Sequence, residues 1–185
     1  ILSIIKSLGC NQAAYRRERR RAIRAVVSEV YSPPRVTAST KLLPEPRILP
    51  GFALDLTTKD VMRDRALAKL RDERPLLLIG SPMCTAFSTW QRISDKLRDP
   101  QVVAAERKRA VEHLEFSISL YREQLRNQRY FLHEHPAYAT SWQEEAMQSL
   151  MKEVGVEFAV CDQCQYGSST LDGSPVKKPT RCLTN

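Results

Sequence analysis

The chain has 185 residues, of which 42% are hydrophobic and 27% are charged, and its net charge is +8. This balance excludes a chain that is disordered over most of its length, and no apolar run is long enough to cross a bilayer. Five cysteines at irregular spacing do not fit a small secreted disulfide scaffold, so we expect an intracellular, reducing location, the nucleus or the cytoplasm. Because the chain starts at Ile1 and stops at Asn185, we also expect an excerpt from a longer protein.

The first predicted element is a basic helix over residues 12–24, and we take residues 1–24 as a basic helical arm. Its arginines, interrupted by Glu18, are Arg16, Arg17, Arg19, Arg20, Arg21 and Arg24. Such a cluster favours a polyanionic partner such as nucleic acid, with Arg16, Arg17, Arg19 and Arg20 as candidate phosphate contacts. The alternative is a solvated helix face.

From residue 25 onward, short apolar runs alternate with longer amphipathic stretches, which predicts an α/β sheet with crossover helices. Strands are expected over residues 25–31, 52–56, 76–79, 130–132 and 156–160, and helices over 36–42, 60–73, 102–126 and 141–154. The spacing of Ser141 and Glu144 predicts a capping box at the start of the last helix. Residues 161–185 are expected to form loop and hairpin, with a tight turn at Asp172 and Gly173.

Ligands of open α/β sheets bind beyond the carboxyl ends of the strands, so the residues that follow each predicted strand are candidate site residues. In chain order these include Tyr31, Ser32 and Pro33, then Asp55, then Pro82 and Cys84, then His133, Glu134 and His135, and finally Cys161 and Cys164. An acid after the second strand, here Asp55, is suited to accept hydrogen bonds from ribose hydroxyls.

Over residues 26–185 the chain resembles the C5-cytosine DNA methyltransferases, because the residues after its predicted strands follow the order of that family's motifs. Residues 80–85 resemble the nucleophile loop of that family, and residues 131–136 resemble the strand that ends in its catalytic glutamate. The stretches at 166–167, 178–180 and 184–185 resemble a late motif of phage-type members. The sequences of these stretches resemble still more closely the methyltransferase-like domains in retrotransposon polyproteins of microbial eukaryotes.

The resemblance implies a Rossmann-like, doubly wound sheet of the S-adenosylmethionine-dependent methyltransferase type, truncated here. Residues 25–185 would then form a catalytic domain that is incomplete at its C-terminus and lacks a target-recognition domain. The implied cofactor contacts are Tyr31, Ser32, Pro33, Asp55, Asp60 and Pro82. The implied nucleic-acid contacts, besides the basic arm, are Ser88, Lys178 and Thr180.

The resemblance also implies covalent methyl transfer to C5 of cytosine in DNA. The target base would be flipped into the pocket, the thiolate of Cys84 would attack C6, and protonated Glu134 would stabilise the adduct at N3. C5 would then take the methyl group, and loss of the C5 proton and of Cys84 would complete the cycle.

Three features depart from the family's pattern. Pro33 and Pro34 stand in a first turn that normally carries glycine, Met83 directly precedes Cys84, and His135 replaces the usual Asn. Two alternatives therefore stay open. One is a catalytically inactive, methyltransferase-like nucleic-acid-binding module of a retroelement polyprotein, and the other is an RNA cytosine methyltransferase.

A metal site is not expected. Cys161, Cys164 and Cys182 offer three thiols, whereas a structural zinc site takes four ligands. His133 and His135 are expected to point to opposite sides of their strand and to act as structural polar partners.

Overall fold

The computed structural model describes residues 26–40, 48–56 and 61–185. The predicted basic helix with Arg16, Arg17, Arg19 and Arg20 lies outside the described residues, as does Asp60. Within the described ranges, no helix is long and apolar enough to cross a membrane.

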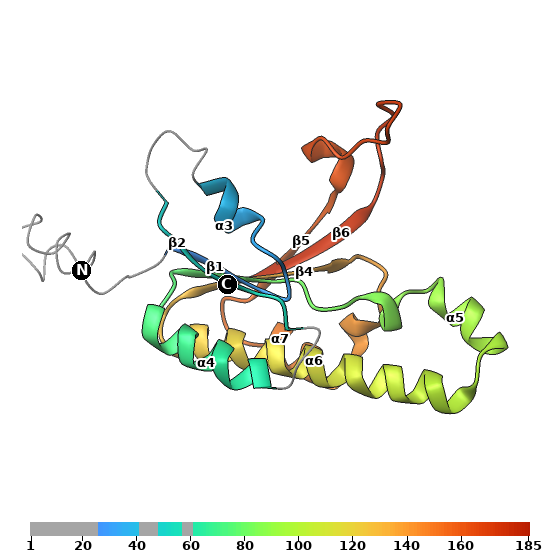
Figure 1. Cartoon of the computed structure of the whole chain (residues 1–185), viewed down its shortest axis with the longest axis horizontal. Helices are drawn as coiled ribbons and strands as arrows, with labels where there is room; N and C mark the ends of the chain where they lie inside the picture. The colour runs from blue at the N-terminus through green and yellow to red at the C-terminus, as the bar shows by residue number, and fades with distance from the viewer. Residues whose placement is uncertain (1–25, 41–47, 57–60) are drawn as a thin grey trace, which may run out of the picture.

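The protein is built on one six-stranded, mostly parallel sheet (Figure 1). Its strands are β1 (Val27–Val30), β2 (Pro50–Leu54), β3 (Leu77–Gly80), β4 (Tyr130–Pro136), β5 (Glu157–Asp162) and β6 (Pro179–Thr184). Their order across the sheet is β2-β1-β3-β4-β6-β5, and the first four run parallel. Strand β6 is antiparallel to both of its neighbours, β4 and β5. The predicted α/β class is therefore confirmed, and the sheet is compatible with a Rossmann-like fold.

Helices lie on both faces of the sheet. They are α3 (Val36–Ser39), α4 (Val61–Glu73), α5 (Gln91–Ser94), α6 (Pro100–Arg126) and α7 (Glu145–Met151). Figure 1 shows α4, α6 and α7 together on one face and α3 on the other, above β1 and β2. Helix α5 lies to the side of the sheet, next to the start of α6.

Helix α6 is the longest helix described, and its sequence explains both its start and its placement. Asp99 caps it by accepting a hydrogen bond from the Gln101 amide at 2.8 Å, and Pro100 occupies the first turn, where its missing N–H costs nothing. Leu114, Ile118 and Tyr121 recur at spacings of four and three, which puts them on one face of the helix, and all three are buried. This face of α6 therefore forms much of the core.

Gly80 gives α6 its closest approach to the sheet. A Cβ atom at this position would overlap the Tyr121 hydroxyl and lie 2.9 Å from Tyr121 Cζ. The Tyr121 ring stacks on Phe131 with centroids 4.7 Å apart, and its hydroxyl lies 3.0 Å from Nδ1 of His133. The absence of a side chain at the end of β3 thus lets α6 pack closely on the sheet face formed by β3 and β4.

The structure differs from the sequence prediction in three respects that concern β4, α7 and β6. Strand β4 continues to Pro136, so His133, Glu134 and His135 lie within the strand and not after it. The capping box is wrong: the Ser141 hydroxyl bonds Nδ1 of His135 at 2.7 Å, Glu144 pairs with Arg107, and α7 begins without a side-chain cap. Part of the region predicted as loop and hairpin forms β6, inside the sheet.

We predict that Gly80→Ala destabilises the protein by about 1–3 kcal/mol, because an added methyl group must displace the Tyr121 ring. Tyr121→Phe removes the atom of closest overlap, so the double variant Gly80→Ala/Tyr121→Phe should be more stable than the sum of the single effects. Urea denaturation of all four proteins measures this coupling. Strict additivity of the two changes would contradict the contact.

Candidate active site

The strand order changes direction at β1, and the carboxyl ends of β1 and β3 lie next to each other. The chain passes from β1 to β2 on one side and later places β3 on the other side of β1. Such a change of direction leaves an opening beyond the ends of the two central strands, where ligands of open α/β sheets bind. Tyr31, Ser32 and Pro33 follow β1, and Pro82 and Cys84 follow β3. The fold thus brings the sequence-predicted residues of these two turns to one edge.

Tyr31 begins the first turn with a backbone conformation that is rare for an aromatic residue, φ 60°. Its side chain is buried beneath the sheet edge, and its hydroxyl shares a 3.0 Å hydrogen bond with Nδ1 of His113 on α6. The ring therefore belongs to the core. Ser32 and Pro33, in contrast, are partly or fully exposed, as is Asp55 beyond β2.

Glu29, a buried acid on β1, organises the rest of this turn. Its carboxylate accepts hydrogen bonds from the amides of Arg35, Val36 and Thr37 at 3.1, 3.1 and 2.7 Å, and from the Thr37 hydroxyl at 2.6 Å. Burial raises the pKa of Glu29, but these hydrogen bonds outweigh it and lower the pKa below its usual value. The amides that begin α3 are therefore already occupied by the protein's own carboxylate.

The loop after β3 carries Cys84. This residue directly precedes a short 3-10 turn, Thr85–Phe87, and its free thiol is half-buried. The loop starts with a hydrogen bond from the Ser81 amide to the Val30 carbonyl at 3.3 Å. It ends with the fully buried ring of Phe87, which packs against the His135 ring at 5.9 Å. Cys84 therefore lies on a loop with fixed ends.

His135 holds the loop from β4. A carbonyl oxygen can only accept, so the 2.9 Å contact is a hydrogen bond from Nε2–H of His135 to the Pro82 carbonyl. Nδ1 is then the acceptor for the Ser141 hydroxyl. Burial lowers the pKa of His135 to about 4, which agrees with this neutral tautomer. His135 thus fixes the backbone two residues before Cys84.

His133 and His135 lie on the same face of β4, so the prediction of opposite sides is wrong. Residues two apart in a strand share a face, and the two rings are 4.9 Å apart. Both rings also meet Trp142 nearly at right angles. Their expected role as buried polar partners agrees with these contacts. Among the described residues, no group of His, Cys, Asp and Glu side chains is arranged to hold a metal ion.

Glu134 points to the opposite face of β4, away from α6 and on the side that carries α3. Its strand partner is Cys182 on β6. Burial, the Cys161 thiol and the Glu134 carboxylate together raise the pKa of Cys182 to about 11, so Cys182 is a thiol at neutral pH. Within the described residues, Oε1 of Glu134 is buried and has no hydrogen-bond partner. Such an oxygen is costly to bury unless a ligand provides a donor.

The sheet register brings the Cys84 loop alongside Glu134. Gly80 on β3 pairs with His133 on β4, so the chain leaving β3 continues next to Glu134 and His135. The hydrogen bond between His135 and Pro82 shows that this proximity persists beyond the end of the strand. The thiol and the carboxyl group therefore come from neighbouring strands at one edge of the sheet.

The remaining predicted contacts are less uniform. Lys178 is exposed, whereas Thr180 is buried and its hydroxyl donates to the Lys178 carbonyl at 3.2 Å. Ser88 follows the 3-10 turn, and its hydroxyl oxygen accepts a hydrogen bond from the Trp90 amide at 3.3 Å. Pro82 is buried, and its carbonyl is taken by His135. Lys178 is thus the best exposed of the predicted nucleic-acid contacts in the described residues.

We predict that stability falls as the pH is lowered from about 6.5 towards 4. A histidine with a pKa of about 4 when folded and about 6.5 when unfolded takes up its proton preferentially in the unfolded state. The stability that it contributes is fully present above pH 6.5 and decreases by about 3 kcal/mol as the pH falls to 4. His135→Gln, which keeps a donor for Pro82, should make the decline measured by urea denaturation less steep. An unchanged slope would contradict the buried neutral state.

Comparison with known proteins adds no assignment. No protein-family model matches the chain, and no curated protein matches its sequence.

Proposed function

We propose that the chain is the catalytic part of an S-adenosylmethionine-dependent methyltransferase that acts on C5 of cytosine in DNA, with Cys84 as nucleophile and Glu134 as acid. The observation that carries the proposal is the buried oxygen of Glu134 that has no hydrogen-bond partner among the described residues, on the strand next to the one that leads into the Cys84 loop. A flipped cytosine offers a ring nitrogen and an exocyclic amino group, which match a carboxyl group that has one oxygen without a partner.

The side chains at the first two strand ends fit this cofactor better than a dinucleotide. Glu29 occupies the amides that begin α3, and Pro33 and Pro34 have no N–H, so a phosphate group would find few donors there. S-adenosylmethionine carries no phosphate. Asp55, exposed beyond β2, can accept hydrogen bonds from its ribose hydroxyls, and the oxygens of the turn from Ser32 to Pro34 suit its ammonium group.

The proposed mechanism assigns one step to each of the two residues. The Cys84 thiolate forms a bond to C6 of the cytosine, and Glu134 donates a proton to N3, which takes up the electron pair. When bound, the cofactor supplies the methyl group that C5 accepts. Water then takes the C5 proton, the ring double bond re-forms as the Cys84 thiolate leaves C6, and N3 returns its proton to Glu134. His135 takes no part in these bonds and keeps the loop in place through Pro82.

A second candidate is a nucleic-acid-binding module without activity, which a different observation favours. The Tyr31 ring is packed in the core, and the proline-containing turn is tied to Glu29, so less of the first turn is open to a cofactor. The net charge of +8 and the proposed arm of Arg16, Arg17, Arg19 and Arg20 suit either candidate. An RNA cytosine methyltransferase would use the same thiolate chemistry, and parallel assays on DNA and RNA separate the two substrates.

We predict that Cys84→Ala abolishes covalent trapping on DNA that contains 5-fluorocytosine, because no other thiol lies on the loop beyond β3. Glu134→Gln should slow adduct formation by about 10²–10⁴-fold, as expected for loss of a general acid. Denaturing gels measure the adduct. Cys164→Ala, which removes a half-buried thiol from the turn after β5, is the matched control and should trap as well as the unmodified protein. An adduct that survives Cys84→Ala would refute the assignment of the nucleophile.

A further inference from the structure

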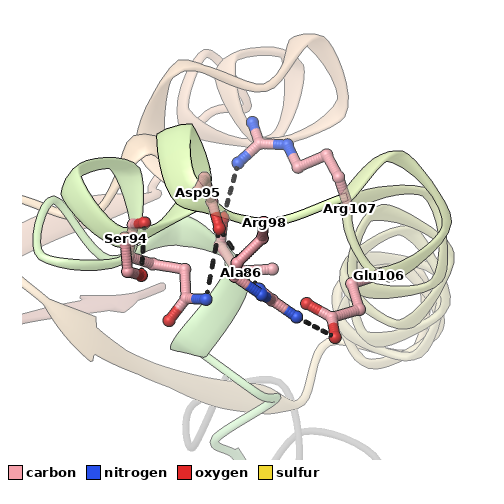
Figure 2. Close-up of polar contacts among 7 residues, drawn as sticks. Ala86, Ser94, Asp95, Arg98, Glu106 and Arg107 are labelled. Atoms are coloured by element: carbon pink, nitrogen blue, oxygen red, sulfur yellow. Dashed lines mark hydrogen bonds and ion pairs between the residues drawn. The ribbon is translucent and has the colours of Figure 1, made fainter. Parts of the chain in front are cut away.

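Arg107 on α6 contacts the Cys84 loop after Cys84, whereas His135 contacts it before Cys84. Its guanidinium donates to the Ala86 carbonyl at 3.1 Å and to the Thr140 hydroxyl at 2.9 Å, and it pairs with Glu144. It also lies over the Phe87 ring, 4.5 Å from the centroid. Figure 2 shows the Arg107 side chain reaching from α6 towards Ala86. One side chain thus touches two of the three residues of the turn that follows Cys84.

A pocket lies behind the turn Thr85–Phe87, so the hydrogen bond from Arg107 to the Ala86 carbonyl restrains a segment that has space beside it. This pocket of about 320 Å³ lies between the turn, α5 and α6, and Ala86, Arg107 and Thr140 are among its walls. Its other charges are paired without Arg107, since Arg98 binds Asp95 at 3.2 Å and Glu106 at 2.6 Å (Figure 2). The turn therefore has room to move into the pocket, and Arg107 is the side chain that restrains it at the Ala86 carbonyl.

We propose that Arg107 is a positioning residue for Cys84. Cys84 lies two residues after Pro82, which His135 holds, and two residues before Ala86, which Arg107 holds. The two anchors come from different elements, β4 and α6, so together they fix the thiol relative to the sheet edge. This role rests on the proposed function only in what the thiol is used for; the restraint on the loop is independent of any substrate.

The guanidinium is required for its shape as well as its charge. A planar fork can serve three acceptors while it stacks on an aromatic ring, whereas a lysine ammonium is a single point charge on a flexible stem. Arg107→Lys can keep the ion pair with Glu144 but cannot reproduce all contacts to Ala86, Thr140 and Phe87. A positioning role therefore predicts that Arg107→Lys leaves the protein folded but no longer holds the Cys84 loop in place.

The rate at which iodoacetamide alkylates Cys84, followed by peptide mass spectrometry on the whole chain, tests the proposal. Cys161, Cys164 and Cys182 are measured in the same samples and report on any general loosening. Arg122→Ala is the matched control. Arg122 lies on the same helix, is similarly exposed, and binds Glu153 at 2.8 Å and Ser149 at 2.9 Å, with no contact to the loop among these interactions.

We expect Arg107→Ala and Arg107→Lys to raise the alkylation rate of Cys84 by roughly tenfold, because the freed loop exposes the thiol more often. Tenfold is the factor that one charged hydrogen bond typically contributes to a local equilibrium. The other cysteines should react as before, and Arg122→Ala should leave Cys84 unchanged. An equal effect of Arg107→Ala and Arg122→Ala, or a parallel change at all cysteines, would overturn the proposal. Because the assay needs neither cofactor nor nucleic acid, failure to detect methyl transfer would leave this result standing.

Discussion

The contact of Tyr121 with Gly80 and His133 is the constraint on which the rest of the site depends. It seats α6 against β3 and β4, because the helix can come this close only where the strand has no side chain. Once α6 is seated, its other residues fall into place along the sheet edge. His113 reaches the Tyr31 hydroxyl, and Arg107 reaches the turn after Cys84. One buried contact thus connects the turn after β1 with the loop after β3.

The side chains on the two faces of β4 have different roles in the candidate site. His133 and His135 face α6 and are neutral, buried partners that fix backbone and ring positions. Glu134, between them, faces the other side, where its buried oxygen has no partner in the described part of the chain. On β4, strand alternation therefore separates the two histidines that support the structure from Glu134, which we propose to act on a substrate. A shift of β4 by one residue would exchange these roles.

Much of the fold could be predicted from local pattern, because buried parallel strands and amphipathic crossover helices leave distinct periodicities in the sequence. The sequence did not reveal how far β4 extends, since three polar residues in a row suggest a loop. Only the folded protein shows that Tyr121 bonds Nδ1 of His133 and that Ser141 and the Pro82 carbonyl bond both nitrogens of His135. The place of β6 between β4 and β5 depends on pairing with distant segments and has no local signal.

The sequence pattern pointed to candidate residues near strand ends. It did not point to the residues that hold those segments in place. Cys84 and Glu134 were named as site residues because the carboxyl edge of such a sheet is the expected place for ligands, and their catalytic roles stay a prediction. Glu29 could have been noticed as an acid inside an apolar strand, but its acceptor role depends on the turn of the chain into α3. Arg107 is one of many charged residues on a long helix, and only the folded protein shows that its partners are Ala86, Thr140 and Glu144.

The most direct test of the account is calorimetric titration of the whole chain with S-adenosylmethionine. The proposal requires the sheet edge beyond β1, β2 and β3 to bind the cofactor, with Asp55 as the acceptor for its ribose. It predicts binding of one molecule in the micromolar range and weaker binding by Asp55→Asn. Absence of binding at millimolar cofactor would contradict the proposed activity and leave a nucleic-acid-binding module as the better description of this fold.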